Sequence, residues 1–172
     1  MSPEPITPVI TIEPAQAPDF DWCAQLMAGS EPWLTLRLDL EKCRKVLHRP
    51  GGELFVAREP RQPRRESHGQ DGHATAGFQP LGFILIDPHG FAGSPYIASI
   101  GVAADARGKG IGAQLLGSAE RHVAGRRFLF LCVSSFNHRA QKFYCSLGYE
   151  RVGEIPNYII EGHSELLLCK KL

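Results

Sequence analysis

The chain has 172 residues, which predicts one domain, and 43% of them are hydrophobic, enough to build one core. Its 19 Lys and Arg residues nearly balance 18 Asp and Glu residues, and this formal charge of +1 argues against a protein that coats nucleic acid. No apolar run approaches the roughly 18 residues of a membrane span, and no secretory leader pattern is visible. We therefore expect a cytoplasmic protein whose partners include neither nucleic acid nor a membrane.

The cysteines are scattered, and they form neither a C-x-x-C pair nor a cluster at zinc-ligand spacing. We therefore expect reduced thiols and no bound metal. The five cysteines are Cys23, Cys43, Cys132, Cys145 and Cys169.

A short strand and two helices are predicted in the first 50 residues. Residues 9–12 form a β-branched run typical of a strand. Asp19 offers a helix N-cap, and Gly29 a stop for that helix. Asp39 caps a second predicted helix, which we expect the glycines at 51–52 to end.

Residues 54–57 and 81–86 are short apolar runs bounded by turn residues, and they predict two strands. The segment between them is rich in Arg, Gln, Pro, Gly, Ser and His, a composition that buries too little apolar surface to order itself. We therefore expect a mobile loop around residues 60–79. Neither flank makes a complete domain, so we expect one domain over residues 9–172 after a flexible leader of residues 1–8.

The second half of the chain alternates strands with helices. Hydrophobic periodicity and turn residues define these elements. The predicted strands are 96–102, 128–133, 149–155 and 165–170, and the predicted helices are 110–123 and 137–147, the latter ended by Gly148.

A glycine-rich turn, residues 107–112, joins a predicted strand to a predicted helix. Its three glycines let the backbone approach a ligand, and the helix that follows directs unpaired N–H groups and a partial positive charge toward it. Arg107 and Lys109 add charge-assisted contacts. The turn therefore predicts a diphosphate-binding cradle.

Two other phosphate-binding patterns fit this turn less well. A Walker A loop needs Lys after its second glycine and then Ser or Thr, whereas Lys109 precedes Gly110 here. A dinucleotide G-x-G-x-x-G that starts at Gly108 would end at Ala113, and it would normally follow the first strand of its fold. A nucleotide-binding module remains an alternative on these grounds.

Two segments resemble the GNAT superfamily of acetyl-CoA-dependent N-acetyltransferases. The superfamily's Q/R-x-x-G-x-G/A motif is present as Arg107-x-x-Gly110-x-Gly112. Its N-x-x-A-x-x-(F/L)-Y-x-x-x-G-F/Y segment is present as Asn137-x-x-Ala140-x-x-Phe143-Tyr144-x-x-x-Gly148-Tyr149.

The resemblance implies an α+β fold with a mostly antiparallel sheet of about six to seven strands, splayed between the fourth and fifth, and about four helices. It also implies acetyl-CoA as co-substrate and no metal. The residues it assigns to pantetheine are Ile100, Gly101 and Val102, with Asn137 and Tyr144 beside the thioester. Those it assigns to the diphosphate are Arg107, Gly108, Lys109, Gly110, Ile111, Gly112 and Ala113.

The implied reaction moves an acetyl group to a primary amine by direct attack through a tetrahedral intermediate. Tyr144 matches the family's general-acid position, and the backbone N–H of Val102 could stabilise the oxyanion. Similar ribosomal-protein N-acetyltransferases commonly carry a Glu base five residues before the motif Asn, where this chain has Cys132. Other candidate bases are Glu31, Asp87 with His89, Glu161 and Glu165.

The acceptor side is less defined by the sequence. Glu31 and Trp33 could hold a cationic amine through charge and a π face, and Tyr158 could line the acceptor pocket or merely pack. A small-molecule or peptide primary amine is expected, and the sequence leaves its identity open. The chain could also pair as a homodimer. A non-catalytic acyl-CoA-binding module or sensor is the alternative function, because the family's Glu is missing.

Overall fold

The predicted strands pair into one sheet in a computed structural model that describes residues 10–60 and 78–172. Within that part, seven strands follow the order β1-β2-β3-β4-β5-β7-β6, and every neighbouring pair is antiparallel except β4 and β5. The strands are β1 (Thr11–Pro14), β2 (Glu53–Pro60), β3 (Phe78–Phe91), β4 (Ser94–Val102), β5 (Phe128–Ser134), β6 (Glu150–Pro156) and β7 (Ser164–Lys171).

Four α-helices accompany the sheet in the described residues, together with one short 3-10 turn. They are α1 (Ala17–Ala28), α2 (Leu40–Leu47), α3 (Ile111–His122) and α4 (His138–Ser146), and the turn η1 is Ala104–Ala106. The expected α+β fold, with its mostly antiparallel sheet splayed between the fourth and fifth strands, is confirmed, and the structure adds that these two strands are parallel.

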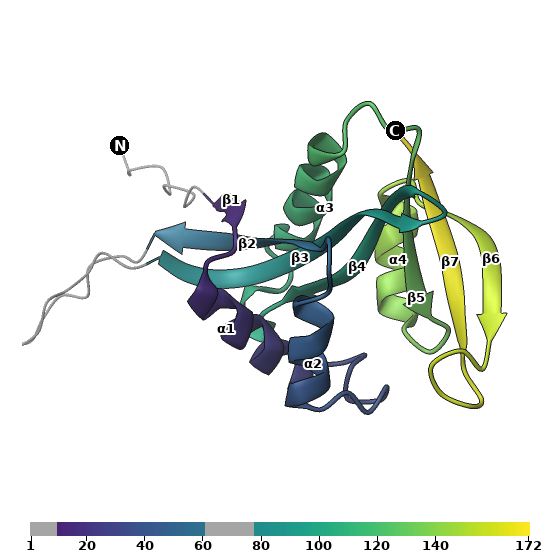
Figure 1. Cartoon of the computed structure of the whole chain (residues 1–172), viewed down its shortest axis with the longest axis horizontal. Coiled ribbons are helices and arrows are strands. Elements are labelled where there is room, and N and C mark those ends of the chain that lie inside the picture. The colour runs from purple at the N-terminus through teal and green to yellow at the C-terminus, as the bar shows by residue number, and fades with distance from the viewer. Residues whose placement is uncertain (1–9, 61–77) are drawn as a thin grey trace, which may run out of the picture.

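The helices cover the sheet on both faces, with α1 and α2 on one face and α3 and α4 on the other (Figure 1). β3 explains this arrangement, because it is apolar at successive positions. Phe83 and Leu85 pack into the core under α1 and α2, whereas Ile84 and Ile86 pack into the core under α3 and α4. A strand buried on both faces reads as a continuous apolar run.

The start of α1 differs from the prediction. The helix begins at Ala17, with Gln16 as N-cap and Pro18 in the first turn, where a fixed φ favours helix initiation. Asp19 therefore lies inside the first turn, and its carboxylate accepts the Gln16 N–H at 2.7 Å. The same buried carboxylate pairs with Arg58 of β2, which ties α1 to the sheet.

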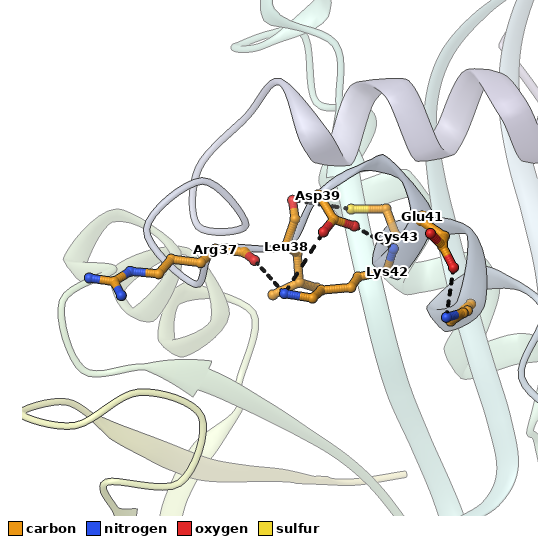
Figure 2. Close-up of polar contacts among 7 residues, drawn as sticks. Arg37, Leu38, Asp39, Glu41, Lys42 and Cys43 are labelled. Atoms are coloured by element: carbon orange, nitrogen blue, oxygen red, sulfur yellow. Dashed lines mark hydrogen bonds and ion pairs between the residues drawn. The ribbon is translucent and has the colours of Figure 1, made fainter.

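The predicted cap of α2 is confirmed (Figure 2). The Asp39 carboxylate accepts the Lys42 N–H at 2.8 Å, and the Lys42 ammonium donates to the Arg37 carbonyl at 3.2 Å. The helix ends at Leu47, before the glycines that were expected to end it, because Pro50 cannot continue a helix.

Several predicted boundaries lie close to the observed ones, but β3 is longer than expected and runs on to Phe91. The expected leader of residues 1–8 and the centre of the loop expected around residues 60–79 lie outside the described residues. Across 10–60 and 78–172, no helix is long and apolar enough to cross a membrane.

Candidate active site

The sheet opens between β4 and β5. These strands pair only at Tyr96 with Phe130 and at Ile97 with Leu131. Beyond Ile97, β4 stays paired with β3 as far as Val102, while β5 stays paired with β7. In Figure 1, β7 and β6 accordingly run at a steep angle to β2 and β3. The C-terminal half of β4 therefore has one free backbone edge.

The register decides which residues face this opening. Opposed residues of an antiparallel pair alternate between hydrogen-bonded and non-bonded pairs. The Ala103 N–H donates to the Leu81 carbonyl at 2.8 Å, so Ala103 is in a hydrogen-bonded pair with β3. Two residues earlier, the backbone N–H and C=O of Gly101 bond to β3 as well, whereas those of Ile100 and Val102 do not. Ile100 and Val102 therefore turn their N–H and C=O groups toward the opening.

Arg107 uses part of this edge. Its Nε donates to the Val102 carbonyl at 3.1 Å, which folds the side chain back over the end of β4. Among the described hydrogen bonds none involves the Val102 N–H, which remains directed at the opening. The terminal nitrogens of the exposed Arg107 guanidinium stay near the strand end, where they can meet an anion.

The glycine-rich turn has the backbone that its sequence predicts. Gly108 and Gly110 have φ values of +79° and +78°, and Gly110 is the N-cap of α3. A Cβ at either position would meet no atom within 4 Å, so backbone conformation, not crowding, favours glycine there. The open space lies in front of the first N–H groups of α3, a ready anion site.

Gly112 has a different reason to be glycine. A Cβ there would lie 3.0 Å from the Phe143 ring, so the missing side chain lets α3 approach α4. Ile111 beside it is buried in the core. The Ile111 side chain and the Cβ position of Gly112 therefore both point into the protein. Only the backbone N–H groups of these two residues can contribute to the predicted diphosphate site.

The α4 motif supplies Asn137 and Tyr144. The Asn137 amide oxygen accepts the Ala140 N–H at 3.2 Å, so this side chain caps α4. Tyr144 is buried about two turns further on, and burial raises the pKa of its hydroxyl. Within the described part, the Tyr144 hydroxyl makes no hydrogen bond. Two side-chain oxygens there are both inaccessible to solvent and without a hydrogen-bond partner, those of Thr11 and Ser99, and the Tyr144 hydroxyl is not one of them.

Three acceptor-side candidates lie in different surroundings. The Trp33 ring is buried, stacks on Phe83 at 6.2 Å, and lies 3.1 Å from where a Cβ of Gly101 would be. Trp33 is thus beside the end of β4. Glu31 is exposed and accepts the Thr35 N–H at 3.2 Å, whereas Tyr158 is 66% exposed between β6 and β7.

A polar cluster of Tyr96, Cys132, Ser134 and Glu165 lies on the sheet face that carries α1 and α2. Alternate residues of β5 enter the core under α3 and α4, so Cys132 and Ser134 point the other way. The Ser134 hydroxyl donates to Glu165 Oε1 at 2.6 Å across the β5–β7 pair. The Tyr96 hydroxyl faces the Cys132 thiol, and burial and this contact raise the pKa of Tyr96.

Burial also raises the pKa of Glu165, although the Ser134 hydrogen bond opposes the rise. It raises the pKa of Cys132 as well, and the Glu165 charge adds to that effect. Sequence reasoning named Glu165 among several acids but missed Tyr96 and Ser134. Ser134 continues the Cys132 alternation along β5, but only the register reveals its Glu165 partner. In the chain segments described, no group of three or more His, Cys, Asp and Glu could hold a metal ion.

Comparison with known proteins agrees with this arrangement. The model of the acetyltransferase (GNAT) family matches residues 25–149, more than half of the chain. The chain belongs to this family. An uncharacterized N-acetyltransferase of Methanocaldococcus jannaschii is 33% identical over 82 residues, which are 46% of this chain. The matched part spans about half (53%) of that relative's length.

Solved structures share the whole fold at low sequence identity. NAA60 of Arabidopsis thaliana in complex with acetyl-CoA has a TM-score of 0.69 at 17% identity, covering 95% of this chain and 99% of that one. The spermidine N-acetyltransferase of Vibrio cholerae has a TM-score of 0.65 at 15% identity, with 94% and 93% covered. The ribosomal-protein-S18-alanine N-acetyltransferase of Escherichia coli has 0.63 at 17%, with 95% and 94% covered.

Proposed function

We propose that the protein transfers an acetyl group from acetyl-CoA to a primary amine. The observation that carries the proposal is the free edge of β4, where Ile100 and Val102 face the opening directly before the left-handed turn at Gly108 and Gly110. An extended ligand with amides at one end and a diphosphate at the other matches both features. Membership in the acetyltransferase family supports the same ligand.

The residues present fit pantetheine and diphosphate. The pantetheine amides would pair with Ile100 and Val102 as an added strand would. The first N–H groups of α3, with Arg107 and Lys109, would hold the diphosphate. Bound there, acetyl-CoA would supply an activated thioester carbonyl next to α4. The NAA60 complex supports this co-substrate for a chain of the same fold.

Two groups of this chain would serve the transfer itself. The Tyr144 hydroxyl would hold a proton for the departing thiolate, because a tyrosine is neutral at physiological pH and burial raises the pKa of this one further. The N–H of Val102 would donate to the oxyanion that forms when the amine attacks. Trp33, buried beside the end of β4, would border the amine.

The acceptor is a small-molecule or peptide primary amine. The fold is shared with a spermidine acetyltransferase and with an acetyltransferase named for a ribosomal-protein alanine, so it suits both kinds of amine. Glu31 and Tyr158 remain predicted contacts for an acceptor, and a homodimer remains a prediction.

Release of free thiol from acetyl-CoA across a panel of polyamines, amino acids, aminoglycosides and peptide amines tests this function. We expect turnover with at least one class. A rise in melting temperature with CoA but no turnover on any amine would favour the non-catalytic binding module. Stabilisation by NAD or ADP and not by CoA would favour the nucleotide-binding alternative.

A further inference from the structure

The position where similar N-acetyltransferases carry a base holds Cys132, whose pKa is raised by burial, so the thiol does not ionise at neutral pH. Transfer to an amine still needs a group that accepts the nitrogen's proton. The chain must then either leave this proton to water or supply a carboxylate from another element.

Most of the acids named as candidate bases are engaged or turned outward. Asp87 pairs with Arg49 at 3.3 Å and accepts the His89 N–H at 3.1 Å. Glu31 closes its own turn, and Glu161 is exposed in the connection between β6 and β7. None of these three has a described contact with the opening between β4 and β5.

Glu165 is different, because it is a buried carboxylate held in one orientation. Its residue is 6% exposed, and the Ser134 hydroxyl holds Oε1 at 2.6 Å. Within the described residues, Oε2 of Glu165 accepts no hydrogen bond. It is also not one of the side-chain oxygens that are both inaccessible to solvent and without a hydrogen-bond partner. One oxygen is therefore fixed and the other can reach a ligand.

Glu165 also lies toward the opening. Its charge raises the pKa of Cys132 on β5 and of Tyr96 on β4, so the carboxylate lies near both side chains. Tyr96 is one of the last two β4 residues to pair with β5 before the strands part. The carboxylate thus approaches, from the α1 and α2 face, the place where the strands separate.

We propose that Glu165 is the general base of this enzyme, in place of the acid missing at Cys132. The assignment rests on the proposed acetyl transfer. As the amine nitrogen bonds to the thioester carbon, Oε2 of Glu165 takes its proton and Tyr144 protonates the sulfur when the C–S bond breaks. The amide and the free thiol leave, and a proton returns from Glu165 to Tyr144 through solvent, so both groups regain their starting states.

The surroundings suit this role. A base works best when its pKa approaches the working pH, and burial moves Glu165 in that direction. The titratable groups that face it, Tyr96 and Cys132, carry no charge at physiological pH, and burial raises the pKa of each further above neutral. On β6 the residue opposite Glu165 is Ile155, which carries no charge.

The test compares Glu165→Gln, Ser134→Ala and the control Glu154→Gln, with one amine and across pH. Gln keeps the oxygen that accepts from Ser134, so Glu165→Gln should fold and show the wild-type CoA-induced rise in melting temperature. Its kcat/KM should fall about 10² to 10⁴-fold, and its pH profile should lose the acid-side inflection that belongs to Glu165 and keep the one that belongs to the amine. Glu154→Gln, on exposed β6, should retain the wild-type profile.

Ser134→Ala keeps the base but removes the hydrogen bond that lowers its pKa, so its acid limb should move to higher pH. Protonation of the amine substrate also shapes the pH profile, but it is the same for all variants. It therefore cannot cause the shift of the acid limb in Ser134→Ala. Wild-type rate and limb in Glu165→Gln, or an unmoved limb in Ser134→Ala, would overturn the assignment and leave the transferase standing. A wild type that turns over no amine would instead contradict the proposed function, and the base with it.

Discussion

The two sides of the opening between β4 and β5 are built in different ways. On the proposed co-substrate side, Val102 is followed within a few residues by Arg107 and the glycines of the turn, so one stretch of chain supplies the strand edge and the helix N-terminus. On the proposed acceptor side, the residues come from distant segments, with Trp33 before α2 and Glu165 on β7. Local backbone geometry builds the first side, and tertiary packing builds the second.

This difference explains how each side can change. The co-substrate side depends on φ values that only a few residue types adopt readily, so a substitution there should act directly on ligand binding. The acceptor side depends on neighbouring side chains, so substitutions there should alter rate, stability or pH dependence while leaving the ligand site intact.

The largest effect is expected for Gly110→Asp. The side chain would enter the open space before α3 and place a negative charge where the diphosphate is expected. CoA at 100 times its wild-type Kd should stabilise the wild type by about 2.7 kcal/mol. We expect the variant to lose this stabilisation entirely, as measured by thermal unfolding with and without CoA.

Gly125→Asp is the matched control. Gly125 also has a positive φ, +91°, and a Cβ there would also meet no atom within 4 Å, but it lies beyond the opposite end of α3. Both substitutions place an aspartate at a left-handed φ with open space around its Cβ. Equal loss of the CoA effect in both variants would mean that strain, and not the site, explains the result.

Tyr144→Phe should have the next largest effect. The ring and its packing against Phe143 and Tyr149 are kept, so CoA binding and stability should change little. Loss of a general acid should lower kcat toward the small end of the usual range, about 10²-fold, because a thiolate is already a fair leaving group. Because burial raises the pKa of Tyr144, any alkaline limb should lie above pH ~10.

Tyr149→Phe provides the opposite pattern. The Tyr149 hydroxyl donates to Glu120 at 3.3 Å, away from the opening, so its removal should cost about 1 kcal/mol of stability and leave kcat unchanged. An unaltered kcat in Tyr144→Phe, with chemistry shown to limit the rate, would remove Tyr144 from the mechanism.

Much of the fold could be predicted because its signals are local. Apolar runs marked the strands, Asp39 marked the start of α2, and Gly148 takes a left-handed φ of +86° after α4. The start of α1 was misplaced because Asp19 looks like a cap from sequence. Its carboxylate does serve the first turn, but from inside it, and its partner Arg58 lies on another element.

The candidate site was only half predictable for the same reason. The turn around Gly110 carries its geometry in its own residue types. The Ser134–Glu165 bond depends on the register of β5 against β7, and Tyr96 joins the cluster only because β4 lies beside β5. Glu165 was therefore one acid among several until the sheet order was known.

Gly101→Ala should have a moderate effect on the acceptor side. Its Cβ would lie 2.6 Å from the Phe83 ring and 3.1 Å from Trp33, both buried, and overpacking of this kind costs about 1–3 kcal/mol. Gly112→Ala meets Phe143 at 3.0 Å, but alanine favours a helix by about 1 kcal/mol, so its net change should be near zero. Urea unfolding of both variants measures the contrast, and equal costs would contradict it.

The smallest expected effect is on the stability of Glu165→Gln, which should rise with pH relative to the wild type although the variant loses activity. Burial raises the pKa of Glu165 in the folded protein, so folding favours the protonated acid. That contribution is fully present below the ordinary carboxyl pKa and is lost as pH rises through the folded value. Glutamine does not ionise, so the variant should keep this contribution at every pH. Its free energy of unfolding should therefore match that of the wild type near pH 4 and exceed it near pH 8.

Burial raises the pKa of Glu165, so the stability of the variant relative to the wild type should increase as pH rises from about 4 to about 8. Thermal unfolding at the two pH values measures it, and Glu154→Gln on exposed β6 should show little change between them. A stability difference that does not vary with pH would mean that the folded protein does not penalise the Glu165 charge. A variant that is more stable at pH 8 yet inactive would indicate that the protein keeps a costly buried carboxylate for its chemistry, since packing alone would favour the amide.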